Sequence, residues 1–135
     1  MSQVIFACVH NAGRSQMAAA FLNHFADPKK ATALSAGTQP GTQVHPEVLA
    51  VMKELGIDLS RARPQLLTPE LAKGARYLIT MGCGDQCPMI PGAKILDWPL
   101  EDPKGKPVER VREIRDDVRR RVHEFVEANG WGREE

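Results

Sequence analysis

A cysteine, an arginine and a serine stand close together near the start of the chain. Five residues separate Cys8 from Arg14, and Ser15 follows directly. A cysteine thiolate is a strong nucleophile, and a guanidinium can hold two oxygens of a tetrahedral anion at once. A serine hydroxyl and a helix N-terminus beside the cysteine favour the thiolate form. The spacing therefore predicts attack by Cys8 on the central atom of a bound oxyanion, with Arg14 as its cationic ligand.

The surrounding sequence predicts how these side chains are positioned. Residues 4–9 are continuously apolar, as in a buried parallel strand, and from Ser15 apolar residues recur at helical spacing until Asp27. The backbone N–H groups between strand and helix would surround the anion, and the helix dipole adds positive potential there. The predicted oxyanion-binding residues are Val9, His10, Asn11, Ala12, Gly13, Arg14 and Ser15. We expect left-handed backbone conformations at Asn11 and Gly13.

Further strands and helices alternate along the chain. The predicted strands cover residues 32–36, 76–81 and 93–96, and the predicted helices cover 46–55, 69–73 and 108–125. Gly56 and Gly74 stand just past two of these helices, where a left-handed residue often ends a helix. In the last helix, the run Arg119-Arg120-Arg121 is typical of a solvated face with acidic partners. The alternation predicts a three-layer α/β fold, a doubly wound sheet of four parallel strands, with ligands beyond the strands' carboxyl ends.

Length and composition limit the class of protein. The 135 residues suffice for one domain, so we expect a single domain over residues 1–135. Lys and Arg number 18 against 17 Asp and Glu, which argues against nucleic-acid binding by bulk electrostatics. The longest apolar run is far shorter than the ~20 residues of a membrane helix, and no basic segment precedes it as in a signal peptide. We therefore expect a cytoplasmic protein without nucleic-acid or membrane partners. Because no apolar stripe is left over, we also expect a monomer.

Three cysteines exclude a fully paired secreted framework. Cys83 and Cys87 follow the third predicted strand, so they reach the same sheet edge as Cys8 if the first and third strands are neighbours. Two alternatives stay open for this pair. The two cysteines are buried or incidental, or they form half of a zinc site with His10 or His45. No second Cys/His pair follows at zinc-site spacing.

The chain resembles the low-molecular-weight protein tyrosine phosphatase fold and, within it, the thioredoxin-coupled arsenate reductases. The resemblance runs from residue 4 to about 126, through the segment from Cys8 to Ala18, Ser35-Ala36-Gly37, Gly56-Ile57-Asp58, Thr80-Met81-Gly82-Cys83 and Asp102-Pro103. It implies reduction of arsenate to arsenite for arsenic detoxification, with phosphate or sulfate as substrate analogues. We expect no cofactor and no metal.

The resemblance also implies roles for the three cysteines. Cys8 forms a covalent thiol-arsenate adduct, and Cys83 attacks the Cys8 sulfur to expel arsenite. Cys87 then converts the Cys8–Cys83 disulfide into a Cys83–Cys87 disulfide, which a thioredoxin or similar thiol reductant reduces. The reductant itself, whether thioredoxin, glutaredoxin or a small thiol, is left open. The spacing between Cys83 and Cys87 is shorter than is usual in the best-known reductases.

By the same resemblance, Asp102 is the acid that protonates the leaving oxygen. The residues alone leave Asp97 and Asp85 as alternatives, and Asp102 also fits an ordinary turn before Pro103. Many relatives carry a further loop cysteine at position 13. This chain has Gly13 there, so no disulfide can form within its loop.

Some relatives bind potassium beneath the loop through acidic or hydroxyl side chains. The corresponding positions here are Ala19, Arg63 and Gln65. We therefore expect no such ion, and we expect Ser35 to hydrogen-bond Asn11.

Two other functions remain open from the sequence. The motif from Cys8 to Ser15 does not separate a reductase from a low-molecular-weight protein tyrosine phosphatase that hydrolyses phosphate monoesters. Phosphotyrosine-specific relatives follow their Asp-Pro pair with tyrosines, whereas Lys104-Gly105-Lys106 follows here and the single tyrosine is Tyr77 in a predicted strand. A non-catalytic oxyanion-binding or thiol-sensing module would keep the loop but would have no use for Asp102.

Overall fold

The computed structural model describes residues 2–82 and 92–133 of the chain. Its elements are, in chain order, β1 (Ser2–Cys8), α1 (Arg14–Phe25), β2 (Ala31–Gly37), α2 (Pro46–Lys53), α3 (Pro69–Ala72), β3 (Tyr77–Thr80), β4 (Lys94–Asp97) and α4 (Val108–Ala128). The four strands form one parallel sheet in the order β2-β1-β3-β4. Each of these strands and helices was predicted from the sequence, with ends that differ by up to three residues.

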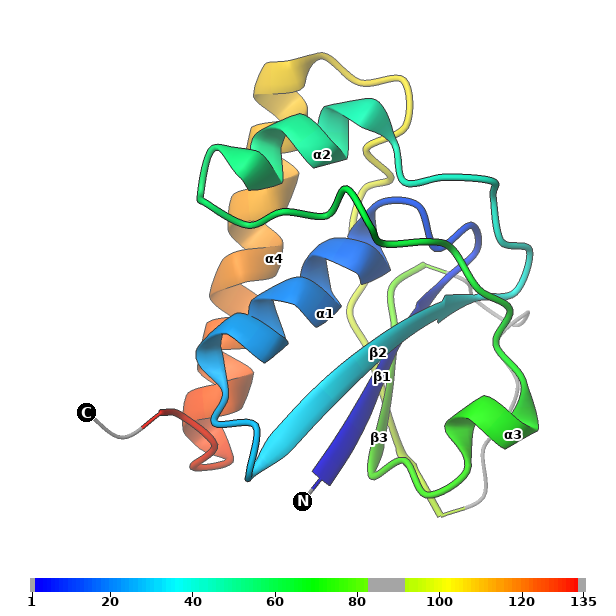
Figure 1. The fold of residues 1–135 in the computed structure, drawn as a ribbon, viewed down its shortest axis with the longest axis vertical. Helices are drawn as coiled ribbons and strands as arrows, with labels where there is room; N and C mark the ends of the chain where they lie inside the picture. Colours follow the sequence, from blue (N-terminus) through cyan, green and yellow to red (C-terminus); the bar gives the residue numbers. More distant parts are fainter. Residues whose placement is uncertain (1, 83–91, 134–135) are drawn as a thin grey trace.

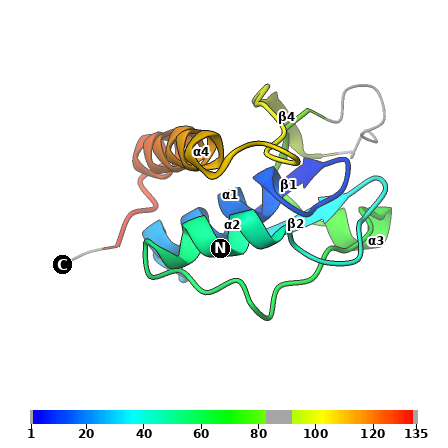
Figure 2. The ribbon, with the colours of Figure 1, turned by 90° about the horizontal axis from the view of Figure 1, so that it is seen from above.

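One face of the sheet carries a thicker layer of helices than the other. α1, α2 and α4 cover one face, and the short α3 lies against the other (Figure 1 and Figure 2). Alternate residues of β1 point to opposite faces, so Phe6 and Cys8 belong to the large core whereas Ile5 and Ala7 belong to the small one. Burial on both faces explains the unbroken apolar run in the sequence. The predicted three-layer parallel α/β fold is confirmed.

The order of the strands decides where a ligand can bind. β1 lies between β2 and β3, because the chain passes from β1 through α1 to β2 on one side and then crosses back to β3. Ala7 pairs with Thr80, and Cys8 pairs with Gly37. The carboxyl ends of β1, β2 and β3 therefore meet at one edge (Figure 1), which is the usual ligand-binding position in an open parallel sheet.

The helix-end signals of the sequence are confirmed. Gly56 and Gly74 have φ angles of 77° and 82°, in the left-handed region. Thr68 caps α3, because its side-chain oxygen accepts a hydrogen bond from the N–H of Leu71 at 3.1 Å. These local signals therefore set the ends of α2 and α3 before any long-range contact is considered.

α4 packs an apolar face on the large core and exposes a charged one. Its buried apolar residues are Val111, Ile114, Val118, Val122 and Val126. On the exposed face, Arg120 pairs with Asp117 at 2.7 Å and with Glu124 at 3.4 Å, as the helical spacing predicted. Although α4 has 21 residues, neither it nor any other helix in the described part of the chain is apolar enough to cross a membrane.

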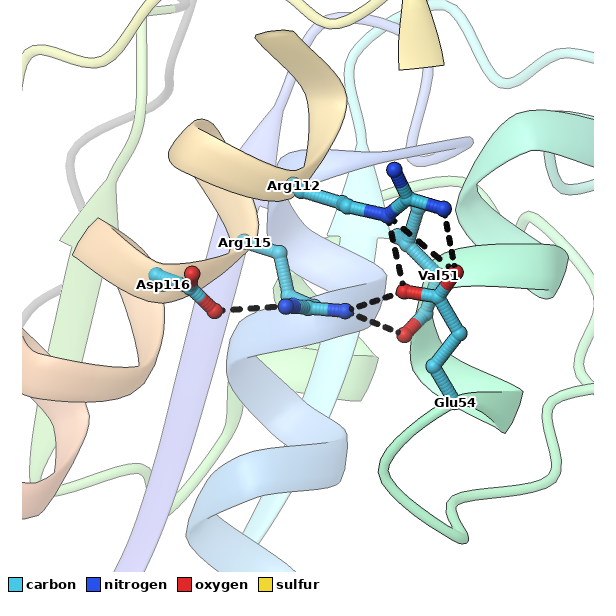
Figure 3. Close-up of polar contacts among 5 residues, drawn as sticks. All are labelled: Val51, Glu54, Arg112, Arg115 and Asp116. Atoms are coloured by element: carbon cyan, nitrogen blue, oxygen red, sulfur yellow. Dashed lines mark hydrogen bonds and ion pairs between the residues drawn. The ribbon is translucent and has the colours of Figure 1, made fainter. Parts of the chain in front are cut away.

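One arginine of α4 departs from this pattern and joins α4 to α2. Arg115 is 8% exposed, and its Nη1 atom donates hydrogen bonds to the backbone oxygen of Val51 and to Glu54, both at 2.8 Å. Its Nε atom donates to Asp116 at 2.8 Å. Arg112 reaches the same Glu54 carboxylate through Nε and Nη2 (Figure 3). We call Glu54, Arg112 and Arg115 the helix clamp; the sequence did not predict it, because Glu54 lies 61 residues from Arg115.

The helix clamp depends on pH through its carboxylate. The side-chain hydrogen bond from Arg112 is the main reason why the pKa of Glu54 lies below its ordinary value. A carboxyl group whose pKa is lower in the folded than in the unfolded state stabilises the fold above its unfolded-state pKa. That contribution is lost as the pH falls through the folded-state pKa. We therefore expect the clamp to weaken only in acid.

Replacing Arg115 by methionine should lower the free energy of unfolding by about 1–3 kcal/mol, because the buried carbonyl of Val51 loses its charged donor. The matched control is Arg112→Met, which removes only exposed contacts to Glu54 and should have a much smaller effect. Urea unfolding of both variants beside the wild type measures the difference. Equal losses in the two variants would contradict the role assigned to the Val51 contact.

Candidate active site

The oxyanion loop, residues 9–15, connects the end of β1 to the first turn of α1. Three of its carbonyls turn outward and accept backbone hydrogen bonds from the segment before α2: Val9 from Gln39 at 2.8 Å, His10 from Gly41 at 2.9 Å, and Ala12 from His45 at 2.9 Å. No oxygen of the described residues accepts a hydrogen bond from the N–H groups of residues 10–13. These donors, together with the positive N-terminal end of α1, suit a bound oxyanion.

Cys8 lies at the base of the oxyanion loop, next to Ser15. The thiol is in the large core, 2% exposed, and its Sγ atom lies 2.9 Å from the Oγ atom of Ser15. The amide of Asn11 donates a hydrogen bond to the same Oγ at 2.7 Å. The hydroxyl hydrogen of Ser15 is therefore free to point at the sulfur and to donate a hydrogen bond to it.

Asn11 holds the loop from within. It is completely buried and has a φ of 51°, the left-handed conformation that the sequence predicted. Its Oδ1 atom accepts hydrogen bonds from the N–H of Gln65 at 3.0 Å and from the amide of Gln16 at 3.3 Å. The expected bond between Ser35 and Asn11 is wrong, because Gln65 lies between them and donates its side-chain amide to the Ser35 carbonyl. The sequence offered no signal for Gln16 or Gln65, since their role depends on the path of the chain.

Arg14 is held from three directions. It is 8% exposed, and its Nη1 atom donates to the backbone oxygen of Leu100 at 3.0 Å. Its Nη2 atom lies 3.7 Å from Oδ2 of Asp102. On the third side is the backbone of Gly82, where an added Cβ would collide with Nη1. The structure thus brings Asp102 to Arg14 and adds Leu100 and Gly82, which the sequence did not single out.

The alternative acids are placed differently from Asp102. The Asp102 side chain is 44% exposed beside Arg14. Asp97 ends β4 and accepts a hydrogen bond from the Thr80 hydroxyl at 2.8 Å, so it serves the pairing of β3 and β4. Asp85 lies outside the described residues. Of the described carboxylates, Asp102 is the one paired with Arg14.

Cys83 and Cys87 also lie outside the described residues. The structure does show that β3 and β1 are neighbours, and that the N–H of Met81 donates to the Ala7 carbonyl at 2.7 Å just past the strand pair. The next residue, Gly82, touches Arg14. The chain therefore reaches the oxyanion loop at residue 82, at the sheet edge where the sequence predicted this segment.

The zinc alternative for Cys83 and Cys87 is not tested, because both cysteines lie outside the described residues. Within residues 2–82 and 92–133, no three His, Cys, Asp or Glu side chains gather around one point. A hollow of about 260 Å³ is lined by Ala19, Arg63 and Gln65, the positions that correspond to potassium ligands in some relatives. Its lining holds no carboxylate, and the guanidinium of Arg63 donates to the Ala62 carbonyl at 3.0 Å. These residues do not fit a potassium ion.

Gly13 does not adopt the left-handed conformation that we expected. Its φ is −144°, and the left-handed residue of the loop is Asn11 instead. Gly13 is the N-cap of α1, and a Cβ added there would lie 2.8 Å from Cγ of Pro103. A side chain at position 13 is therefore disfavoured by the lack of space beside Pro103 and not by a left-handed backbone conformation.

The comparison with known families agrees with this geometry. The family described as low molecular weight phosphotyrosine protein phosphatase matches residues 3–130. The chain belongs to this phosphatase family. The match covers β1 except for its first residue and every later element through α4, including the oxyanion loop and Asp102.

Similar members of the phosphatase family are described as arsenate reductases. A candidate arsenate reductase of Halobacterium salinarum is 40% identical over 87% of this chain and 85% of its own. A solved thioredoxin-dependent arsenate reductase of Corynebacterium glutamicum is 42% identical, with a TM-score of 0.84 over 96% of this chain. This chain spans 62% of that longer protein. An arsenate reductase solved in its phosphate-binding state is 32% identical, with a TM-score of 0.81 over 95% of this chain and 98% of its own.

Within the phosphatase family, this chain has no tyrosine available for an aryl-binding wall. Tyr77 is its single tyrosine. The hydroxyl of Tyr77 donates to Oδ1 of Asn129 at 3.3 Å, and its ring packs edge-on against Phe125 and Trp131 at centroid distances of 5.1 and 5.9 Å. The side chain is therefore committed to the packing of β3 against α4.

Gly82→Ala should weaken phosphate binding by about tenfold or more, because the new Cβ displaces a guanidinium that makes charge-assisted hydrogen bonds. Gly92→Ala is the matched control. Gly82 and Gly92 have similar left-handed φ angles of 98° and 86°, but a Cβ at Gly92 meets no atom within 4 Å. Calorimetric titration with inorganic phosphate measures both variants. If both lose affinity equally, backbone strain and not Arg14 would be the cause.

Proposed function

We propose that this protein is an arsenate reductase, which converts arsenate to arsenite and thereby detoxifies arsenic. One arrangement carries the proposal: a Cys8 thiol lies beside the Ser15 hydroxyl, under a loop whose N–H groups at residues 10–13 bond no oxygen of the described residues and, with Arg14, suit a tetrahedral oxyanion. Arsenate and phosphate share that shape and charge, and one solved relative is described in a phosphate-binding state. The names of the relatives support arsenate as the substrate.

The first chemical step uses only described residues. The loop N–H groups and Arg14 hold oxygens of arsenate, which places its arsenic atom above the Cys8 sulfur. The Cys8 thiolate attacks, so that an S–As bond forms as an As–O bond breaks. Asp102 supplies the proton with which the leaving hydroxyl departs as water. Its place beside Arg14 supports this role.

The reduction step is assigned to the cysteine pair by the sequence resemblance. The Cys83 thiolate attacks the Cys8 sulfur, so an S–S bond forms and the S–As bond breaks with its electron pair left on arsenic. Arsenic thereby passes from the V to the III state and leaves as arsenite. Cys87 next attacks the Cys83 sulfur and frees Cys8, and the two electrons have come from thiols without a further cofactor.

A thioredoxin-type protein is the proposed reductant of the Cys83–Cys87 disulfide. A dithiol protein can return two electrons by thiol–disulfide exchange. The relative from Corynebacterium glutamicum is described as thioredoxin-dependent, and this chain spans 62% of it. Glutaredoxin and small thiols are the competing reductants. Assays of arsenite release with each reductant distinguish among them.

Arsenite release tests the proposed function. With arsenate, thioredoxin, thioredoxin reductase and NADPH, the wild-type protein should form arsenite in proportion to the NADPH consumed. Cys8→Ser should form none, because a serine hydroxyl is hardly ionised at neutral pH. Parallel assays with glutaredoxin and glutathione identify the reductant. Absence of arsenite with every reductant overturns the proposal.

Cys87→Ala should release about one arsenite per protein molecule and then stop, because only the step after arsenite release needs this thiol. The stalled protein should carry a Cys8–Cys83 disulfide, which peptide mass mapping detects. Cys83→Ala is the control, and it should release no arsenite. Repeated turnover by Cys87→Ala with thioredoxin as sole reductant would show that Cys87 is not the resolving thiol.

Hydrolysis of phosphate monoesters is the second candidate function. It is favoured by the fact that Cys8, Arg14 and Asp102 meet without help from the cysteine pair. In that reaction water would replace Cys83 and attack a phosphorylated Cys8. Cys83→Ala would then keep its activity on an aryl phosphate while losing arsenite release. An aryl phosphate hydrolysed far more efficiently than arsenate is reduced would favour the phosphatase.

A further inference from the structure

Three contacts attach the Asp102 segment, residues 100–104, to the oxyanion loop. Two of them run through Arg14, which meets the Leu100 carbonyl at 3.0 Å and the Asp102 carboxylate at 3.7 Å. The third is apolar and joins Pro103 to Gly13. Pro103 is buried although the residues after it are exposed. Pro103 is therefore the part of this segment that is seated in the protein.

The seat of Pro103 exists because residue 13 has no side chain. A Cβ at Gly13 would lie 2.8 Å from Cγ and 3.5 Å from Cδ of Pro103, with His45 Cδ2 at 3.6 Å on the other side. Carbon atoms at van der Waals contact are about 3.5–4.0 Å apart, so Pro103 and a side chain at residue 13 cannot both stay in place. The proline ring is rigid and its backbone is fixed to Asp102, so a displaced ring moves the acid.

We infer that Gly13 is a positioning residue for the acid of the proposed reaction: its missing side chain seats Pro103 and thereby holds Asp102 beside Arg14. This inference rests on the proposed function for the role of Asp102. The Asp102 carboxylate is fixed on its own segment by the backbone N–H of Lys104, which donates to Oδ1 at 3.0 Å. Asp102 therefore moves with the turn that Pro103 anchors.

A displaced acid affects the rate more than the binding of the anion. Proton transfer needs the carboxyl group within hydrogen-bonding reach of the leaving oxygen, and a displacement of about 1 Å costs up to about a hundredfold in rate. The N–H groups of the loop are unchanged in a Gly13→Ala variant, since alanine keeps its backbone donor. We therefore expect kcat to fall by about tenfold or more while phosphate affinity changes by less than about threefold.

A double-mutant cycle separates the lack of space from any backbone effect of the glycine. Pro103→Ala lacks Cγ and Cδ, the two atoms that a Cβ at residue 13 would meet. Gly13→Ala should therefore lower kcat about tenfold or more in the wild type but have little effect in the Pro103→Ala background. Gly132→Ala is the control outside the site, because a Cβ there meets only the end of the Glu127 side chain, at 3.3 Å, and its φ is not left-handed. Its kcat should equal that of the wild type.

The pH profile and Asp102→Asn show whether the lost rate belongs to the acid. Gly13→Ala should weaken the part of the pH dependence of kcat that Asp102 causes in the wild type. Asp102→Asn should lower kcat far less in the Gly13→Ala variant than in the wild type. Equal effects of Gly13→Ala on both proline backgrounds, or an unchanged pH profile, would overturn the inference. If Gly13→Ala alone does not fold, the inference requires that the double variant Gly13→Ala/Pro103→Ala folds. Failure of both variants to fold would also overturn the inference.

Unfolding in urea gives a readout that does not depend on arsenate. Gly13→Ala should lower the denaturation midpoint in the wild type and have little effect in Pro103→Ala. If the wild type releases no arsenite but this coupling is present, the proposed function fails while the seat of Pro103 stands. If arsenite is released and the coupling is absent, the function stands and the inference fails.

Discussion

The backbone of residues 10–13 leaves N–H groups that bond no oxygen of the described residues, and the segments packed around the loop hold it in this shape. Carbonyls that turn outward need partners, which Gln39, Gly41 and His45 supply from the segment before α2. The turn also places Asn11 in the left-handed region, where its amide bonds Ser15. The end of β2 passes so close that a Cβ at Gly37 would lie 2.6 Å from the Val9 carbonyl oxygen. The loop is therefore shaped mainly by its neighbours, and no ligand is needed to explain its form.

Arg14 connects this loop to the segment that carries the acid. A guanidinium has five N–H donors in a plane, so Arg14 can bond the Leu100 carbonyl and still offer donors to an anion. A lysine has no fixed fork and could not hold both partners in set directions. The same cation lies 3.7 Å from Asp102. Anion binding and proton donation are thereby tied to one side chain.

The helices support the loop from a distance. α2 begins at residue 46, directly after His45, whose N–H bonds the Ala12 carbonyl of the loop. The other end of α2 is joined to α4 by the helix clamp, in which Glu54 meets both Arg112 and Arg115 (Figure 3). Because a helix is stiff over eight residues, a contact at its far end limits movement at its start. Arg115 is 8% exposed, so this contact is less screened by water than the other ion pairs of α4.

Local patterns in the sequence were enough to predict the elements and the centre of the site. The apolar run before Cys8 predicted a strand buried on both faces, and the periodicity after Ser15 predicted α1. Glycines past α2 and α3 indicated where these helices end. These predictions succeed because each depends on residues within a few positions of one another, where hydrophobic periodicity and backbone preference act directly.

The partners of the site were decided only by the tertiary structure. Sequence reasoning placed Ser35 against Asn11, but the path of residues 63–67 puts Gln65 between them. It gave Gly13 a left-handed turn, whereas the glycine is required by the approach of Pro103 from 90 positions away in the chain. It described Arg119-Arg120-Arg121 as a solvated face and gave no signal that Arg115 of the same helix is buried against α2. The sequence by itself determined which residues carry the chemistry; the packing of distant segments determined what holds them, because steric contact and burial depend on distance in space and not on distance along the chain.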